Sequence, residues 1–264
     1  MKPKALILQA HGSNRDFDVI EALTLAGADA IGIPLNKLRM NKTLLADFQL
    51  LVLPGGFSYA DALGAGKLLA LDLASYFANE ISAFVESGKP VIGICNGFQA
   101  LVKSGILPFG EKKEERRKND AKATLTFNAQ GHFECRWVTL KPISQKCIWT
   151  SGSDEIITCP IAHGEGNFQT HELFPLSSFI EQDQVALSYT HADGLPANGE
   201  YPVNPNGSVL DIAGICNPQG NVLGLMPHPE NYIHAWQHPR HTRGEMRGSG
   251  LKLFENGVKY AKQI

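Results

Sequence analysis

The chain has 264 residues, of which 24 are Lys or Arg and 26 are Asp or Glu, giving a formal net charge of −2. A single domain of this size buries about 70–75% of the unfolded surface and needs neither disulfides nor metal to fold. The near-neutral balance excludes the strongly basic surface typical of nucleic-acid and anionic-membrane binding. With no signal-peptide pattern and no apolar run of membrane-spanning length, we expect a cytoplasmic protein that binds neither nucleic acid nor membrane.

The first half of the chain alternates short apolar runs with segments of helical periodicity. Strands are predicted at 5–8, 30–33, 50–53 and 91–94, and helices from Asp16 to Gly27, at about 65–85 and from 96 to Gly105. The apolar face of the first helix is predicted to be Val19, Ile20, Leu23 and Leu25. This alternation favours an α/β fold with a parallel sheet covered on both faces, in which ligands bind beyond the carboxyl ends of the strands.

The second half has strands without long helices between them. They are predicted at 133–140, 156–161, 185–189, 212–215 and 222–226, and a last helix at 251–260. Short turns such as 217–221 are typical of antiparallel pairing. We expect these strands to pack on the same core, so that residues 1–264 form one domain.

Between the two halves, residues 111–122 carry six positive and four negative side chains and almost nothing apolar. Such a run is typical of a solvated segment, and the alternative is a docking surface for a partner. We interpret it as a charged insertion in the domain.

Five cysteines are present, an odd number without a C-x-x-C pair, at positions 95, 135, 147, 159 and 216. This spacing argues against a disulfide framework and against a zinc site, and favours a reducing compartment. His234, His238 and His241 have spacings that a metal could use, but no cysteine or acidic cluster completes a site. We therefore expect no metal.

Cys95 follows a buried apolar run and precedes a helical pattern, and small residues, Gly93 and Gly97, flank it on both sides. A strand–turn–helix corner of this kind exposes a nucleophile, as in serine hydrolases. The helix N-terminus directs unpaired N–H groups at the sulfur and favours the thiolate. The alternative is a buried structural cysteine.

A nucleophilic cysteine needs a base, and the base needs an orienting group. His228 follows the predicted strand 222–226, between two prolines that stiffen its backbone. Glu230 can accept a hydrogen bond from the second ring nitrogen and fix the tautomer. The alternative is a strand-end histidine beside a solvated carboxylate.

Two further turns follow strands and offer main-chain groups. Gly55 and Gly56 let backbone N–H groups approach a ligand, so one half of an oxyanion hole is predicted here, with the Asn96 N–H as the other half. His163 and Glu165, in an H-G-E-G sequence, are equally consistent with substrate contact and with a simple turn. No phosphate-binding glycine motif points to a nucleotide site.

Taken together, the segments 54–59, 93–99 and 227–230 resemble the triad-type (class I) glutamine amidotransferases. The segments 133–138, 160–166, 204–208 and 212–217 narrow this resemblance to the glutaminase subunits of phosphoribosylformylglycinamidine synthase. The chain departs from the pattern at Ala60 and Gly64, where Gly and Arg are more common, and at Arg15, where many relatives have Cys.

The resemblance implies a three-layer, flavodoxin-like fold with a mostly parallel central sheet and additional antiparallel strands. It implies that Cys95 attacks the side-chain amide of L-glutamine and that His228, oriented by Glu230, relays the proton. Gly56 and Asn96 would hold the oxyanion, and Gln99 would touch the substrate.

The ammonia would pass to a synthetase partner that binds ATP, magnesium and formylglycinamide ribonucleotide, often through a complex with a small bridging subunit. The resemblance implies no cofactor on this chain.

Two other functions remain open from the residues. One is a cysteine hydrolase or peptidase of the related flavodoxin-like type, in which the residue after the cysteine is commonly His. Here that residue is Asn96, which cannot titrate. The other is a non-catalytic subunit that keeps the fold. The complete set of Cys95, His228 and Glu230 argues against it.

Overall fold

The computed structural model describes residues 1–108, 123–171, 176–245 and 248–264. The charged segment 111–122 lies outside the described residues, so its interpretation as an insertion stays a prediction. The division of the chain into a single domain also stays a prediction.

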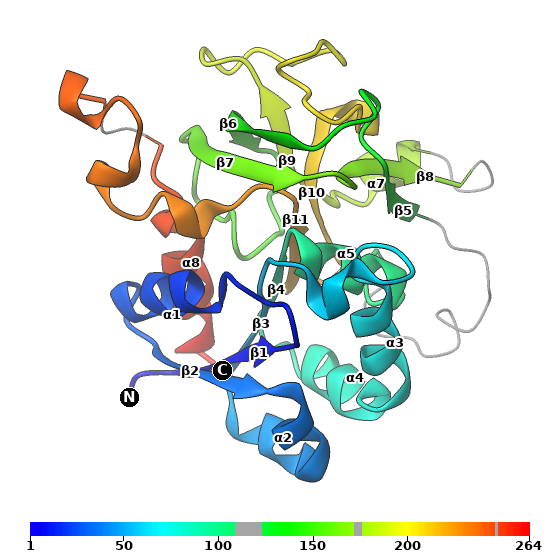
Figure 1. Cartoon of the computed structure of the whole chain (residues 1–264). Coiled ribbons are helices and arrows are strands. Elements are labelled where there is room, and N and C mark those ends of the chain that lie inside the picture. Colours follow the sequence, from blue (N-terminus) through cyan, green and yellow to red (C-terminus); the bar gives the residue numbers. More distant parts are fainter. Residues whose placement is uncertain (109–122, 172–175, 246–247) are drawn as a thin grey trace.

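A nine-stranded sheet runs through the molecule in the order β2-β1-β3-β4-β11-β10-β9-β6-β7 (Figure 1). Its first five strands are parallel, and they are β2 (Asp29–Pro34), β1 (Lys4–Gln9), β3 (Leu50–Leu53), β4 (Val91–Ile94) and β11 (Val222–Leu225). The other four extend the sheet by antiparallel pairing, and they are β10 (Ile212–Cys216), β9 (Val185–Thr190), β6 (Glu134–Pro142) and β7 (Ile157–His163). The predicted mostly parallel sheet with added antiparallel strands is therefore confirmed.

Helices cover both faces of the parallel part, which makes three layers (Figure 1). On one side lie α1 (Asp16–Leu25) and α8 (Leu251–Ala261), which pack on each other. On the other side lie α3 (Lys67–Ser75), α4 (Ala78–Glu86) and α5 (Asn96–Lys103). All residues of β3, β4 and β11 are buried, as expected for strands covered on two faces.

Two expectations about the helices were wrong. The single helix predicted over about 65–85 is two helices, α3 and α4, bent by 81°. Phe77, at the junction, has non-helical φ and ψ angles of −117° and 12°, and its ring is 1% exposed, so the bend brings that ring into the core. Leu25, predicted on the buried face of α1, is 49% exposed because the helix ends there.

Several short elements were not predicted. They are the helices α2 (Leu35–Met40) and α7 (Ser177–Glu181) and a two-stranded sheet of β5 (Ala123–Thr126) and β8 (Asn167–Thr170). These segments are too short to show a period in the sequence, and long-range packing decides their conformation.

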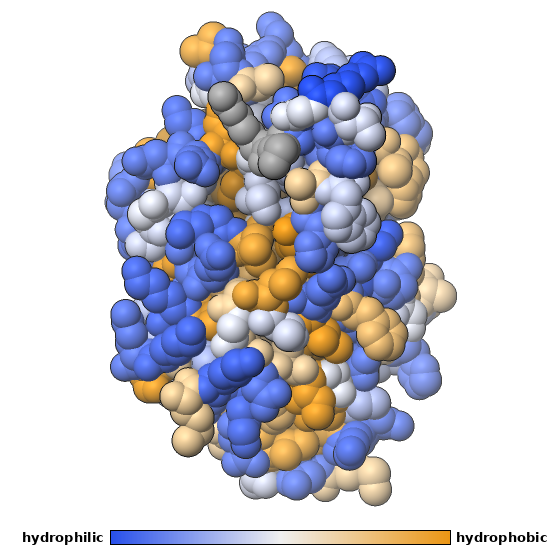
Figure 2. Space-filling view, turned by 90° about the vertical axis from the view of Figure 1, so that its left-hand side faces the viewer, coloured by the Kyte–Doolittle hydropathy of each residue, from blue (hydrophilic) through white to orange (hydrophobic). Residues whose placement is uncertain are grey.

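The surface on the left of Figure 1, near α1, is turned to the viewer in Figure 2. A band of apolar residues runs down its middle, between hydrophilic margins (Figure 2). No single helix among the described residues has the length and hydropathy to cross a membrane; α3 and α4 reach that criterion only as a bent pair.

The carboxyl ends of four adjacent parallel strands bring the predicted site segments together. β1, β3, β4 and β11 are neighbours, so the loops after them lie at one edge of the sheet. The hairpin of β6 and β7 closes over this edge: the His228 N–H donates to the Pro160 carbonyl at 2.8 Å, and the Cys95 sulfur lies 3.9 Å from the Ala162 carbonyl oxygen.

Candidate active site

Cys95 sits on a strained corner between β4 and α5. Its φ of 49° and ψ of −104° are unusual for any residue but glycine, a conformation that costs of order 1–3 kcal/mol and persists only under constraint. The Cys95 N–H donates to the Leu225 carbonyl at 2.8 Å. A Cβ on Gly97 would lie 2.0 Å from the Leu53 oxygen. Close packing of α5 on β3 therefore requires this glycine and holds the corner.

His228 meets Cys95 in the buried cleft. The His228 ring interacts electrostatically with the Cys95 side chain, and its Nδ1 lies 2.7 Å from Glu230 Oε1. His228 is 4% exposed and Glu230 is fully buried. Burial alone lowers the pKa of His228, but the negative charge of Glu230 and the Cys95 sulfur outweigh it and raise that pKa to about 10. The three predicted residues thus lie together in the predicted order of contact.

The loop after β3 meets the N-terminus of α5 beside this group. Gly56 has a φ of 134°, and a Cβ there would lie 2.7 Å from the Asn14 nitrogen. Within the described part of the chain, the main-chain N–H groups of Gly56 and Asn96 donate to no other protein group. Two free main-chain donors on adjoining segments are what an oxyanion requires.

The Asn96 side chain joins the two halves of this donor pair. Its Oδ1 accepts from the Ser58 N–H at 3.1 Å, and its Nδ2 donates to Asp61 Oδ1 at 2.9 Å and to Gln99 Oε1 at 3.1 Å. An asparagine supplies both an acceptor and two donors, so one side chain binds the Gly56 loop to the helix.

Gln99 and Glu165 brace the cleft from the side of α5. Gln99 Nε2 donates to the Glu165 main-chain oxygen at 2.7 Å, so both ends of its amide are occupied by protein groups. The Glu165 carboxylate accepts from the Ala65 N–H at 3.2 Å and from Lys103 Nζ at 3.3 Å. Contact of either residue with substrate stays a prediction.

His163 ends β7 and is 3% exposed. Its Nδ1 lies 3.2 Å from Asn128 Oδ1, which also accepts from the Gly166 N–H at 3.0 Å, so Nδ1 is the protonated nitrogen. Its Nε2 is buried without a protein partner. Burial and the positive charge of His228 lower the pKa of His163 to about 3, so the ring offers a neutral acceptor.

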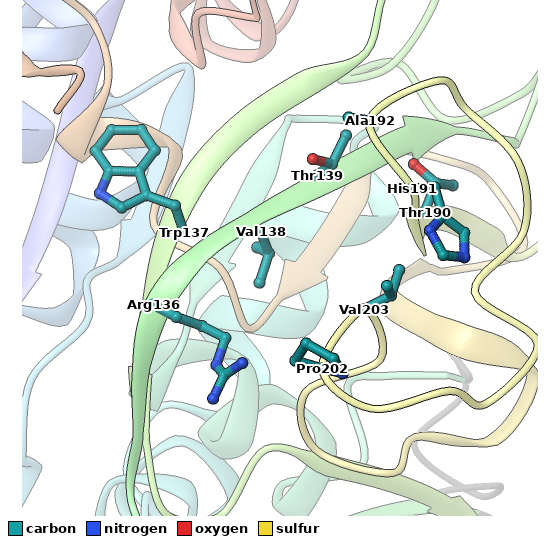
Figure 3. A pocket seen from close by; sticks show the side chains of 9 residues that line it. All are labelled: Arg136, Trp137, Val138, Thr139, Thr190, His191, Ala192, Pro202 and Val203. Atoms are coloured by element: carbon teal, nitrogen blue, oxygen red, sulfur yellow. The ribbon is translucent and has the colours of Figure 1, made fainter. Parts of the chain in front are cut away.

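Sequence reasoning missed Asp61, Asn128 and the Ala162 carbonyl, which act through contacts that no local pattern signals. It also gave no sign of a cavity of about 270 Å³, which lies between β6, the end of β9 and the loop at 202–203 (Figure 3). This cavity is lined by Arg136, Trp137, Val138, Thr139, Thr190, His191, Ala192, Pro202 and Val203 and includes none of the predicted site residues.

Gly55 makes room for the imidazole. A Cβ at this position would lie 2.6 Å from His228 Cε1 and 3.3 Å from Nδ1. We expect Gly55→Ala to push the ring away from Cys95 and to lower kcat/KM for glutamine hydrolysis by about 10²-fold, the cost of an ångström-scale misplacement. Steady-state kinetics check this, and an unchanged kcat/KM would contradict it.

Ala60 occupies a left-handed conformation, with φ 55° and ψ 29°. We expect Ala60→Gly to stabilise the protein by about 0.5–1 kcal/mol, because relief of the left-handed strain exceeds the entropy that glycine adds to the unfolded chain. Ala62, also exposed, has a φ of −55° and gives a matched control in which the same change should destabilise. Urea unfolding of both variants measures the change in the free energy of unfolding, which should be positive for Ala60→Gly and negative for Ala62→Gly.

A buried cysteine at a strand–helix corner lies beside a histidine that is hydrogen-bonded to a glutamate, at the carboxyl edge of a three-layer α/β fold. This arrangement is typical of triad-type glutamine amidotransferases. The family model described as a CobB/CobQ-like glutamine amidotransferase domain matches residues 2–261.

The chain is also similar to individual proteins over nearly its whole length. It is 53% identical to phosphoribosylformylglycinamidine synthase subunit PurQ of Treponema denticola, over 98% of this chain and 99% of that protein. It is 43% identical to the PurQ subunit of Dehalococcoides mccartyi, over 100% and 99% of the two chains. A chain in the structure of PurLQS from Thermotoga maritima superposes with a TM-score of 0.72 at 31% identity, covering 98% of this chain and 99% of that one. The chain therefore belongs to the glutamine amidotransferase family, and within it to the PurQ subunits of phosphoribosylformylglycinamidine synthase.

Proposed function

We propose that this chain hydrolyses L-glutamine to glutamate and ammonia and passes the ammonia to a synthetase partner. That partner converts formylglycinamide ribonucleotide to formylglycinamidine ribonucleotide in purine biosynthesis. The contact of Cys95, His228 and Glu230 in one buried cleft, in a chain that matches its relatives end to end, is the observation that carries the proposal.

The first half of the reaction breaks the amide bond. With the thiol proton already held on His228, the Cys95 sulfur attacks the γ-carbonyl carbon of glutamine. The resulting oxyanion accepts hydrogen bonds from the Gly56 and Asn96 N–H groups. His228 then donates the proton to the amide nitrogen, the C–N bond breaks, and ammonia leaves behind a γ-glutamyl thioester.

The second half regenerates the thiol. His228 takes a proton from a water molecule, whose oxygen attacks the thioester carbon through the same oxyanion site. The C–S bond then breaks, glutamate leaves, and the proton returns to the sulfur. Glu230 accepts from Nδ1 throughout, which keeps Nε2 directed at Cys95 and stabilises the imidazolium.

The raised pKa of His228 suits its role as proton donor. A ring protonated at neutral pH places a positive charge beside the sulfur and holds the proton that the leaving amine needs. We assign His163 to the substrate pocket, together with the loop that carries Glu165, because its buried Nε2 has an unused lone pair. A neutral acceptor suits an amide N–H and repels a carboxylate oxygen.

The partners that we propose are a synthetase subunit and a small bridging subunit, with ATP and magnesium used by the synthetase and no cofactor on this chain. The similar T. maritima chain belongs to a structure of PurLQS, which supports a complex of this kind. A thiol nucleophile accompanied by four further free cysteines requires a reducing compartment, so we place the activity in the cytoplasm.

A chloroketone analogue of glutamine tests the proposal directly. We expect it to alkylate Cys95, as read by peptide mass mapping, and excess glutamine to protect that residue. Cys135 is the exposed thiol, so Cys135→Ala is the matched control and should leave the labelling rate at Cys95 unchanged. Labelling of Cys135 alone, or none, would refute the assignment.

A further inference from the structure

The loop that follows the oxyanion candidate Gly56 is strained along three consecutive residues. Tyr59, Ala60 and Asp61 have φ values of 56°, 55° and 51°, and none is glycine. Each left-handed residue costs roughly 1–2 kcal/mol, and such a run persists only when the surrounding contacts hold it. The contacts that hold this loop therefore constrain the chain that directly follows Gly56.

One of these contacts reaches out of the cleft to α3. The Tyr59 hydroxyl donates to Asp72 Oδ2 at 2.5 Å, and Asp72 also forms an ion pair with Arg39 from α2. The guanidinium of Arg39 in turn lies 4.2 Å from the centre of the Tyr76 ring. The Asp72 side chain is 10% exposed, so its two partners compensate a carboxylate that has lost most of its water.

The Tyr59 hydroxyl stays protonated and available as a donor. Burial, and then the hydrogen bond to Asp72, raise the pKa of Tyr59 to about 12. The main chain of Tyr59 is held as well, since its N–H donates to the His11 carbonyl at 2.6 Å. The side chain and the backbone of this residue are thus held from two different elements.

Side-chain contacts hold the loop at two points, in addition to the main-chain hydrogen bond from Tyr59 to His11. At one, the Asn96 side chain binds Ser58 and Asp61 and ties the loop to α5. At the other, Tyr59 ties it to Asp72 on α3. We propose that Asp72, acting through Tyr59, is a positioning residue that aims the Gly56 N–H at the oxyanion. This inference rests on the oxyanion role of Gly56 and Asn96 in the proposed function.

If Asp72 and Tyr59 position the oxyanion donor, their loss has other consequences than if they only stabilise the fold. Reactions of Cys95 that build negative charge on a carbonyl oxygen need the Gly56 N–H, whereas thiol–disulfide exchange at the same sulfur does not. Loosening the anchor should slow the first kind of reaction and spare the second. General damage to the cleft would slow both.

The experiment compares two reagents on the full chain, with peptide mass mapping confined to Cys95. One is the chloroketone analogue of glutamine, whose ketone oxygen enters the oxyanion site, and the other is a pyridyl disulfide. For Tyr59→Phe we expect the chloroketone reaction to slow by roughly 10-fold, a part of the 10²–10³-fold that loss of a whole oxyanion donor costs. The rate of the pyridyl disulfide reaction in Tyr59→Phe should stay within about twofold of the rate in the unmodified chain, because thiol–disulfide exchange needs no oxyanion donor.

Two further variants make the test specific. Tyr76 lies directly after the end of α3, and its ring contacts Arg39. Tyr76→Phe removes the hydroxyl of that ring and should change neither rate. Asp72→Asn keeps an oxygen that accepts from Tyr59, so its chloroketone reaction should be nearly as fast as that of the unmodified chain. Asp72→Leu removes the acceptor, so its chloroketone reaction should be as slow as that of Tyr59→Phe. The double variant Tyr59→Phe, Asp72→Leu should react no more slowly than either single change.

The outcomes separate this inference from the proposed function. Equal slowing of both reagents in Tyr59→Phe, or an unchanged chloroketone rate, overturns the positioning role. If the unmodified chain does not react with the chloroketone at Cys95, the proposed function itself fails.

Discussion

Replacing Cys95 by alanine is expected to abolish glutamine-dependent synthesis in the assembled complex and to leave ammonia-dependent synthesis nearly intact. In the proposed mechanism the Cys95 sulfur forms the bond to the γ-carbonyl carbon, and Cys95 is the nucleophile at the corner between β4 and α5. Loss of one member of a catalytic triad costs up to about 10⁶-fold in kcat. Ammonia supplied from solution bypasses this step, because the proposed function places the synthetase active site on the partner. Both activities are measured on the same preparation, with either glutamine or an ammonium salt as nitrogen source.

The matched control for this change is Cys135→Ala, which removes an exposed thiol and should keep both activities. Cys159 is a less suitable control because it is buried, and its pKa is raised first by burial and then by the charge of Glu230. Loss of ammonia-dependent synthesis in Cys95→Ala would show that this chain supports the synthetase in some way other than supplying ammonia.

The meeting of Cys95 and His228 was predictable although the two residues are 133 positions apart. Each follows a short apolar run that reads as a buried strand, and parallel strands end at one edge of a sheet. The order of the strands was not predictable, yet β4 and β11 are direct neighbours, paired from Val91 with Val222 to Ile94 with Leu225. The local sequence pattern therefore identified the residues of the candidate triad, and the long-range pairing of strands placed them together.

The supporting contacts could not be predicted from local pattern. The left-handed run from Tyr59 to Asp61 contains no glycine, which is the residue that would have signalled it. Gln99 was expected to touch substrate because it lies on the first turn behind Cys95. In the structure both ends of its amide bind protein groups, Asn96 and the main chain of Glu165, which is 66 positions away. Such pairings depend on how loops meet after folding, and no spacing rule reports them.

Glu230→Gln is expected to lower kcat for glutamine hydrolysis by about 10²- to 10⁴-fold, the range that the third member of such triads covers. Glu230 Oε1 accepts from His228 Nδ1 at 2.7 Å, and the carboxylate is fully buried. A glutamine can present its NH₂ to Nδ1 and so select the tautomer whose Nε2 is already protonated and cannot take the thiol proton. Steady-state kinetics measure the loss, with Glu255→Gln, at a half-exposed surface pair, as the matched control. A kcat within a few fold of the unmodified enzyme would contradict an orienting role.

The same pair makes stability depend on pH in a direction that Glu230→Gln should remove. The folded-state pKa of His228, about 10, lies above its ordinary value of 6.5, so the folded chain binds this proton more tightly than the unfolded chain does. The resulting stabilisation is fully present below pH 6.5 and is lost as pH rises through 10. In Glu230→Gln the carboxylate no longer holds the proton, so the stability difference between the two proteins should shrink steadily from pH 6.5 to 10. Urea unfolding across this range tests the sign, and a difference that grows with pH would show that Glu230 does not stabilise a charged His228.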